Sequence, residues 1–285
     1  MRSSDTTILV FDSGVGGLSV AQSILLRLPG IRIVYVADDA AFPYGTKSEA
    51  VLKKRILDVI LPLQASSQAD LVVIACNTAS TIILPDLRTR LTIPVVGVVP
   101  AIKPAATLSQ TRHIGLLATP ATINRTYTDQ LLNDFAADCR VVRVGSSRLV
   151  ELAESYLRDD KVDLEALRQI ILPFFMSEEA PESSAGLDVI VLGCTHFPLL
   201  RQQLAQVAPY PVSWIDSGDA IASRVEQVLG GQNLLPQMQD LKTHHLVFTG
   251  NADLSEPFKK HLMGLGFTRF NWTQNYLAFS PSIDQ

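Results

Sequence analysis

The sequence predicts an α/β protein built on doubly wound, mostly parallel sheets. Short apolar runs alternate along the chain with longer segments in which apolar residues recur at helical spacing, such as Lys47–Gln64 and Asp163–Phe175. Several runs are rich in Val and Ile and lack the in–out alternation of a strand with one wet face, which is typical of strands covered on both sides. Strands that alternate with helices favour right-handed βαβ units.

The short apolar runs are the expected strands. They are Ile8–Phe11, Ile31–Val36, Leu71–Ala75, Pro94–Val98, Ile114–Leu117, Cys139–Val144, Val189–Leu192, Val212–Ile215 and Leu246–Phe248. Asp70–Cys76 and Asp188–Cys194 share an Asp, five mostly apolar residues and a Cys, and Ile8–Ser13 weakly echoes Ile114–Thr119. Internal duplication and chance similarity both stay open. Either way, each of two strands ends at a cysteine, at the sheet edge where open α/β folds bind ligands.

Length and charge exclude several classes of protein. The 285 residues suggest about two domains. The net charge of -4 and the lack of any run of basic residues argue against nucleic-acid binding. The charge-free stretch Leu71–Pro85 is too short to span a membrane and is interrupted by polar residues. No apolar signal core follows the N-terminus, so we expect a cytoplasmic protein without a membrane partner.

The chain has three cysteines, Cys76, Cys139 and Cys194, which are too few and too far apart for a disulfide scaffold or a zinc ribbon. We expect free thiols and no metal site. Cys139 stands at the start of an expected strand and lacks the Asn, Thr or His residues that follow Cys76 and Cys194, so we interpret it as structural. The remaining histidines outside position 196 have no metal-like spacing and are expected to be surface or structural residues: His113, His244, His245 and His261.

Asp12–Gly17, with the sequence DSGVGG, follows the first expected strand and opens a helix. Its glycines permit a tight turn, and a helix N-terminus favours an anion. The spacing is not that of a dinucleotide site, and Asp12 would repel a pyrophosphate. Three interpretations stay open: a turn with Asp12 or Ser13 as the helix cap, a small carboxylate site with Asp12 as an acid/base partner, and, least favoured, a nucleotide site.

Cys76–Ser80 and Gly193–Pro198 each follow an expected strand with a cysteine and polar neighbours. Cysteines at strand ends are often small apolar residues, and Asn and Thr often cap helices. However, a helix N-terminus favours a thiolate. His196 lies two residues from Cys194, where it suits a thiol/imidazole pair. A hydrolytic Cys–His nucleophile is the alternative, but it would leave Cys76 without a role.

Pro43–Gly45, with the sequence PYG, follows the acidic pair Asp38 and Asp39 after the second expected strand. A simple Pro-Gly turn is one interpretation. The other is a rim whose backbone amides, together with the phenol of Tyr44, reach into the cleft at the carboxyl ends of the strands.

Together these motifs carry a family resemblance. DSGVGG at 12–17, PYG at 43–45, CNTAS at 76–80, GCTHFP at 193–198 and IDSGDAIA at 215–222 resemble, in this order, the motifs of the glutamate racemases of the aspartate/glutamate racemase superfamily. The resemblance spans residues 8 to about 222. The motifs are specific as a set and not one by one.

The resemblance implies two pseudo-symmetric α/β domains with the active site in the cleft between them. The first domain would comprise residues 1–99 and 209–285, and the second would comprise residues 100–208. It also implies a cofactor-independent isomerase that interconverts L- and D-glutamate and supplies D-glutamate for peptidoglycan. Its partner would be the small-molecule substrate, and a homodimer is left open. The short segment before the first strand makes activation by a cell-wall precursor less expected than in relatives with a longer extension.

By the same resemblance, Cys76 and Cys194 are the acid/base pair on opposite faces of the substrate Cα. Asp12 would assist Cys76, and His196 would assist Cys194. Substrate binding would fall to Asp12, Ser13, Tyr44, Gly45, Asn77, Thr78, Thr195 and His196.

A glutamate orients the histidine in this family, and Glu154 is the matching position. Glu151 competes for this role, because Ser146 and Ser147 stand where the family often has Cys-Pro.

Inversion of a stereocentre by deprotonation needs a base on one face and an acid on the other, since a single group would return the proton to the face it came from. Two thiols suit this task because a thiolate and a thiol exchange roles when the reaction reverses. Two alternatives remain: a sister racemase that acts on aspartate or another amino acid, and a non-catalytic, two-lobed amino-acid-binding protein.

Overall fold

The computed structural model describes residues 6–176, 186–236 and 242–273. It divides into two compact units: Met1–Val98 with Gly218–Gln285, and Val99–Ser217. The sequence places the chain's return to the first domain at residue 209. The division instead falls after Ser217, because strand β8 (Ser213–Ile215) pairs with β7 (Val189–Leu192) in the second unit.

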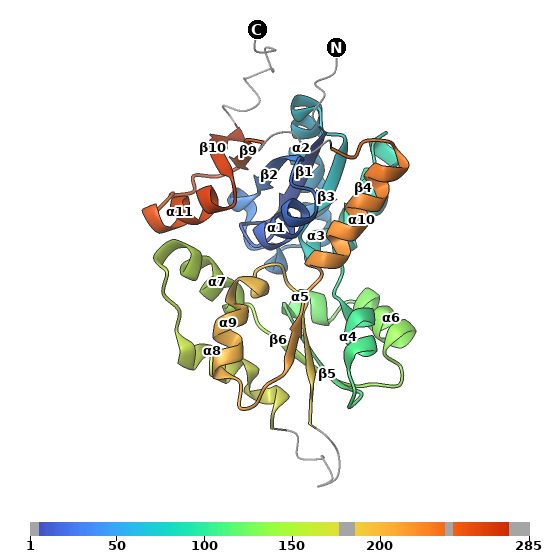
Figure 1. Cartoon of the computed structure of the whole chain (residues 1–285), viewed down its shortest axis with the longest axis vertical. Coiled ribbons are helices and arrows are strands. Elements are labelled where there is room, and N and C mark those ends of the chain that lie inside the picture. The colour runs from blue at the N-terminus through green and yellow to red at the C-terminus, as the bar shows by residue number, and fades with distance from the viewer. Residues whose placement is uncertain (1–5, 177–185, 237–241, 274–285) are drawn as a thin grey trace. The chain divides into compact units, whose positions relative to one another are not determined.

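The first unit contains a six-stranded sheet in which all neighbouring strands run parallel, in the order β10-β9-β2-β1-β3-β4 (Figure 1). Its strands are β1 (Thr7–Asp12), β2 (Arg32–Ala37), β3 (Leu71–Ile74), β4 (Val95–Gly97), β9 (His244–Phe248) and β10 (Phe267–Trp272). Its helices are α1 (Leu18–Arg27), α2 (Glu49–Ser67), α3 (Asn77–Arg90), α10 (Gly218–Gly231) and α11 (Glu256–Gly264), with 3-10 turns η1 (Asp39–Ala41) and η2 (Tyr44–Thr46).

Burial explains why the central strands are continuous apolar runs. Every residue of β1 and β3 is buried. Leu9 and Phe11 belong to a core cluster with apolar side chains of α2 and α3, which pack against each other. Helices α1 and α10 pack together as well. A strand with helices over both of its faces has no position for an exposed polar residue.

The second unit contains a four-stranded parallel sheet in the order β6-β5-β7-β8. The two further strands are β5 (His113–Ala118) and β6 (Arg140–Gly145). Its helices are α4 (Ile102–Leu108), α5 (Pro120–Ile123), α6 (Thr126–Phe135), α7 (Arg148–Asp159), α8 (Leu164–Ile171) and α9 (Arg201–Val207), with 3-10 turns η3 (Leu172–Phe174) and η4 (Phe197–Leu200). The expected fold class, α/β with mostly parallel sheets, is confirmed.

The two sheets have the same strand topology over four strands. In the first unit β1 lies between β2 and β3, with β4 beyond, and in the second β5 lies between β6 and β7, with β8 beyond. The sequence echoes fall on equivalent strands of this pattern: β1 with β5, and β3 with β7. Asp70 accepts a hydrogen bond from the backbone N–H of Thr7, and Asp188 accepts one from that of Thr111. Asp70 thus binds the first residue of β1, and Asp188 binds the segment just before β5, and this similarity favours duplication over chance.

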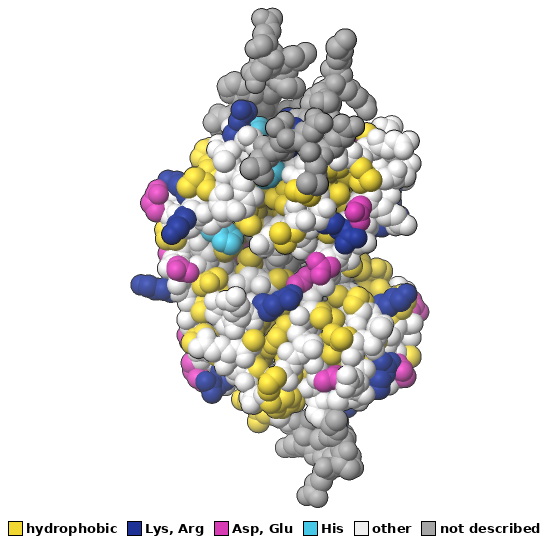
Figure 2. Space-filling view, viewed as in Figure 1, with side chains coloured by type: hydrophobic (Ala, Val, Ile, Leu, Met, Phe, Trp, Pro, Cys, Tyr) yellow, Lys and Arg dark blue, Asp and Glu magenta, His cyan; other side chains and the backbone are white. Residues whose placement is uncertain are grey.

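The sequence missed one strand of the first sheet. Strand β10 lies at the sheet edge, and after its first residue its side chains are exposed or half-buried. An edge strand with one covered side lacks the apolar run on which the prediction depended. On the face drawn in Figure 2, the Lys and Arg side chains of the described residues alternate with Asp and Glu and form no single basic patch. None of the helices in the described ranges combines the length and apolar composition that crossing a bilayer requires.

Candidate active site

Cys76 lies where the winding of the first sheet reverses direction. The chain proceeds from β1 to β2 on one side, and β3 and β4 lie on the other, so the carboxyl ends of β1 and β3 flank a topological switch point. Asp12 is the last residue of β1, and Cys76 follows β3 and directly precedes α3. In open α/β sheets the loops at such a point diverge and leave room for a ligand.

Ser13 connects Asp12 to Cys76. Its hydroxyl donates to Oδ1 of Asp12 at 3.1 Å, and its Oγ lies 3.7 Å from Sγ of Cys76. The backbone N–H of Gly14 also donates to Oδ1 of Asp12, at 3.0 Å. All three side chains are buried. The N-terminus of α3 favours a thiolate at Cys76, while the Asp12 carboxylate opposes it, so the hydroxyl between them can serve either protonation state of the thiol.

The first turn of α3 presents an acceptor without a donor. Oδ1 of Asn77 is buried, and no atom of the described residues donates a hydrogen bond to it. The turn is held in place by Ser80, whose hydroxyl donates to the carbonyl of Ile74 and accepts from the N–H of Val98. A buried polar atom without a partner is uncommon in native proteins, and a donor from a ligand is one explanation. Thr78 is buried beside Asn77.

Tyr44 is hydrogen-bonded to the acidic pair that precedes it. Its phenol is buried and donates a 2.5 Å hydrogen bond to Oδ2 of Asp38. Burial is the largest cause that raises the pKa of this phenol, and the negative charge of Asp38 raises it further, so the group stays protonated and donates. Pro43 and Gly45 on either side of Tyr44 are exposed, so the rim presents backbone rather than the hydroxyl.

Cys194 occupies the equivalent place in the second sheet, just after β7. Its Sγ lies 3.8 Å from Nδ1 of His196, and Nε2 of His196 lies 2.9 Å from Oε1 of Glu154 on α7. Cys194 and His196 are buried, as is Thr195 between them. The local turn is tight, because a Cβ on Gly193 would come within 3.1 Å of the side chain of Ala118 on β5.

Electrostatics favour a charged imidazole at His196. Burial disfavours the imidazolium, but the hydrogen bonds and negative charges of Cys194 and Glu154 outweigh it and raise the pKa of His196 well above its ordinary value. Glu154 itself lies 3.5 Å from Arg158, one helical turn later. The imidazolium therefore sits between a sulfur that it can protonate and a carboxylate that keeps its orientation.

The structure separates the two candidate glutamates. The side chain of Glu154 is 13 % exposed and contacts His196. The side chain of Glu151 is 59 % exposed and pairs with Arg148 at 2.8 Å. Of the two, only Glu154 lies within hydrogen-bond distance of the histidine.

The predicted site residues thus fall into two groups, one in each unit. Asp12, Ser13, Cys76, Asn77 and Thr78 gather at the β1 and β3 ends, with the Tyr44–Gly45 rim after β2. Glu154, Cys194, Thr195 and His196 gather at the β7 end.

Several other residues that the sequence singled out lie apart from these groups. Cys139 is half-buried beside Asp138. Nδ1 of His244 accepts from the backbone N–H of Ile33, which is a structural contact. Within the described ranges, no three His, Cys, Asp or Glu side chains are placed to hold a metal ion.

The sequence reasoning missed a polar cluster around Asp38. This residue follows β2 at the same sheet edge and bonds Tyr44, Arg55 and Thr249. The signal that points to it is the acidic pair at 38–39 directly after an apolar strand. Arg55 and Thr249 carry no signal of their own, because they lie in a helix and in a distant segment.

Comparison with known proteins places this geometry in a family. The Asp/Glu/hydantoin racemase family matches residues 18–225 of the chain. A glutamate racemase of Serratia proteamaculans is 47% identical over 262 residues, which cover 92% of this chain and 88% of that protein. A glutamate racemase of Salmonella typhimurium is 51% identical over 223 residues, which cover 78% of this chain and 77% of that protein.

Solved structures agree. A crystal structure of Escherichia coli glutamate racemase in complex with L-glutamate and the activator UDP-MurNAc-Ala matches with a TM-score of 0.84 and 42% identity, over 94% of this chain and 98% of that one. A glutamate racemase isoform of Bacillus anthracis matches with a TM-score of 0.76 and 27% identity, over 94% of this chain and 97% of that one. With its two cysteine sites at equivalent strand ends, the chain belongs to the Asp/Glu/hydantoin racemase family.

Proposed function

We propose that this chain is a glutamate racemase, an isomerase that interconverts L- and D-glutamate by moving the proton at Cα. Relatives that are 47% and 51% identical are glutamate racemases, and the similar Escherichia coli enzyme was crystallised with L-glutamate. One structural observation carries the mechanism. Each unit ends a central strand at a buried cysteine, and each cysteine has its own hydrogen-bonding chain to a carboxylate.

We assign the proton transfers to Cys76 and Cys194, which exchange roles with the direction of reaction. The thiolate of one removes the α-proton, and the thiol of the other returns a proton to the opposite face. The two cysteines are supported differently. Asp12 is connected to Cys76 through the hydroxyl of Ser13. His196, which is hydrogen-bonded to Glu154, contacts Cys194 directly.

The α-proton of an amino acid is much less acidic than a thiol, so the site must stabilise the carbanionic transition state. We assign the acceptor Oδ1 of Asn77 to the substrate ammonium group, because it is buried and lacks a donor among the described residues. The hydroxyls of Thr78 and Thr195, together with the N-terminus of α3, would bind carboxylate oxygens. Dipoles that are fixed before reaction stabilise developing charge at no reorganisation cost.

We further propose that the enzyme works in the cytoplasm on free glutamate, without an added cofactor, and supplies D-glutamate for peptidoglycan. Whether two copies associate is read directly from the mass of the purified protein in light scattering. The exposed backbone at Gly45 would form the rim over the substrate, with Asp12 and His196 near its polar ends.

The test is incubation of each glutamate enantiomer with the purified protein in D2O, without cofactor. We expect loss of optical activity and uptake of one deuterium at Cα from either enantiomer, because a thiol that exchanges with solvent delivers the new proton. Binding without deuterium uptake would instead identify an amino-acid-binding protein and overturn the proposal. Parallel reactions with L- and D-aspartate separate a glutamate enzyme from an aspartate enzyme.

A further inference from the structure

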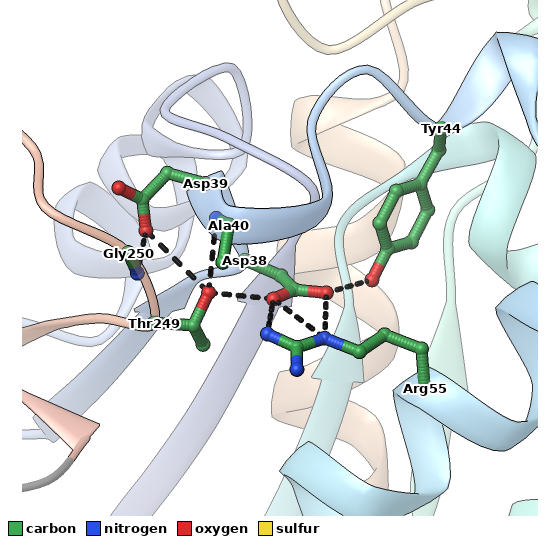
Figure 3. Close-up of polar contacts among 7 residues, drawn as sticks. All are labelled: Asp38, Asp39, Ala40, Tyr44, Arg55, Thr249 and Gly250. Atoms are coloured by element: carbon green, nitrogen blue, oxygen red, sulfur yellow. Dashed lines mark hydrogen bonds and ion pairs between the residues drawn. The ribbon is translucent and has the colours of Figure 1, made fainter.

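Asp38 is the buried centre of a half-buried polar cluster that joins three segments of the first unit. We define the Asp38 cluster as Asp38, Asp39, Tyr44, Arg55, Thr249 and Gly250 (Figure 3). The segments are the loop after β2, the helix α2 and the turn after β9. Asp38 itself is wholly buried.

Arg55 neutralises the buried carboxylate. Its Nη2 donates to Oδ1 of Asp38 at 2.6 Å, and its Nε lies 3.1 Å from both carboxylate oxygens. The hydrogen bond to Asp38 is the largest cause that raises the pKa of Arg55. A buried carboxylate destabilises the fold unless it is paired with a cation and its lone pairs accept hydrogen bonds. Removal of Arg55 would therefore leave the Asp38 carboxylate unpaired and drive it out of its buried position.

Thr249 connects the returning C-terminal segment to the same carboxylate. Its hydroxyl donates to Oδ1 of Asp38 at 2.6 Å and accepts from the backbone N–H of Ala40 at 3.2 Å. The N–H of Gly250 donates to Asp39 at 2.7 Å. The approach is so close that a Cβ on Gly250 would lie 2.7 Å from a carboxylate oxygen of Asp39.

Tyr44 connects the Asp38 cluster to the surroundings of Cys76. Its phenol is held by Asp38, as Figure 3 shows, and its ring belongs to the same core cluster as Cys76. The 3-10 turn η2, which begins at Tyr44, contacts helix α3, and Cys76 directly precedes that helix. The neighbours of Tyr44 are the exposed rim residues Pro43 and Gly45.

We propose that Arg55 and Thr249 are positioning residues of the Cys76 half of the active site, which act through Asp38 on Tyr44 and its rim. This inference rests on the proposed racemase function. Neither residue is placed to touch the substrate. They hold the loop at Tyr44 and Gly45, which contacts the substrate, because their hydrogen bonds keep the Asp38 carboxylate in its buried position.

The proposal has a kinetic consequence. Loss of these contacts would let the rim at Tyr44 and Gly45 move, which weakens binding of the substrate and of the transition state equally. The two thiols and their hydrogen-bonding partners stay in place. We therefore expect Arg55→Gln and Thr249→Val to raise KM for glutamate by roughly tenfold and to change kcat by less than about threefold. Arg27→Gln is the matched control, because Arg27 forms a 2.6 Å pair with Glu226 on the exposed surface of the same unit.

A second readout does not depend on activity. Cys76 and Cys194 are 7% and 8% exposed, so their reaction with iodoacetamide, followed by peptide mass spectrometry, has a matched internal reference. We expect Arg55→Gln and Thr249→Val to speed alkylation of Cys76 by roughly tenfold and to leave Cys194 unchanged. Equal acceleration at both thiols would mean general loosening of the fold and would overturn the proposal.

Rescue separates positioning from simple loss of a side chain. The double variant Asp38→Asn with Arg55→Gln removes both charges of this ion pair, and amide groups replace them. We expect its KM and its Cys76 alkylation rate to lie closer to the wild type than those of Arg55→Gln alone. Additive damage in the double variant would contradict the assignment. If Arg55→Gln does not fold, Arg55→Lys takes its place. It keeps the charge but not the bidentate contact, and we expect it to raise KM above the wild-type value by less than roughly tenfold.

The two levels of inference fail separately. If the wild-type protein does not racemise glutamate, the proposed function is wrong, while the alkylation rates still report on the Asp38 cluster. If the wild type is active and the Arg55 and Thr249 variants match Arg27→Gln in KM and in Cys76 alkylation, the positioning role is wrong and the function stands.

Discussion

Nε2 of His196 lies 2.9 Å from Oε1 of Glu154, although 42 residues separate them in the chain. The contact joins helix α7 to the loop after β7 and fixes which ring nitrogen of His196 faces Cys194. Successive contacts connect Cys194, His196, Glu154 and Arg158, and along this series potential negative and positive charges alternate. Such a series lets a proton move at the sulfur while the carboxylate holds the ring.

Replacement of Glu154 by Gln should weaken the Cys194 half of the site. The variant keeps the shape of the side chain but removes the charge that favours the imidazolium, so we expect kcat/KM to fall roughly 10- to 100-fold. The enantiomers have equal free energy, and therefore kcat/KM must fall equally in both directions, while kcat alone can differ between them. Racemisation kinetics in both directions measure this.

Glu151→Gln is the matched control, because Glu151 lies on the same helix and pairs with Arg148 at the surface. Its kinetics should equal those of the wild type. A larger loss in Glu151→Gln than in Glu154→Gln would contradict the assignment.

Stability should depend on pH through His196. Its pKa is raised in the folded protein, so its charge interactions stabilise the fold fully below the ordinary histidine pKa of about 6.5 and are lost as pH rises through the raised pKa. We expect the difference in free energy of unfolding between wild type and His196→Asn to shrink from pH 6 toward alkaline pH. Urea titrations at several pH values test the sign, and a difference that grows with pH would refute it.

Both strand-end cysteines should be indispensable, since the proposed mechanism assigns each to one face of the substrate. Cys76→Ala and Cys194→Ala are each expected to lower kcat/KM by at least about 1,000-fold with an unchanged circular dichroism spectrum. Cys139→Ala is the control, because Cys139 is half-buried in the second unit with Asp138 as its neighbour, and it should retain activity. A Cys76→Ala or Cys194→Ala enzyme with near-normal turnover would reject the two-base mechanism.

Ser13→Ala should uncouple Asp12 from Cys76. Without the bridging hydroxyl, Cys76 loses the contact with Ser13 at 3.7 Å, and we expect kcat to fall roughly tenfold to 100-fold. Ser19→Ala is the control. Ser19 lies in α1, its hydroxyl donates to the carbonyl of Gly16, and the kcat of this variant should stay near that of the wild type. Equal kcat in the two variants would show that Asp12 acts without Ser13.

The sequence by itself determined the elements that local chemistry specifies. Apolar runs without alternation predicted the buried parallel strands, and β1, β3 and β7 lie where expected. The GCTHFP motif likewise predicted that Cys194 and His196 lie together, whereas the pairing of Asp12 with Cys76 was implied by the family resemblance. The first two inferences need only period, turn chemistry and the rules of parallel sheets.

The tertiary structure alone decided what depends on distant partners. Glu151 and Glu154 are three residues apart and share nearly one helix face, so only packing selects the one that meets His196. The second unit ends at Ser217 rather than near residue 208, because β8 pairs with β7. The phenol of Tyr44 turned to Asp38 because that carboxylate is buried, and a buried carboxylate must gather donors from wherever the chain brings them, here from Thr249, 211 residues away.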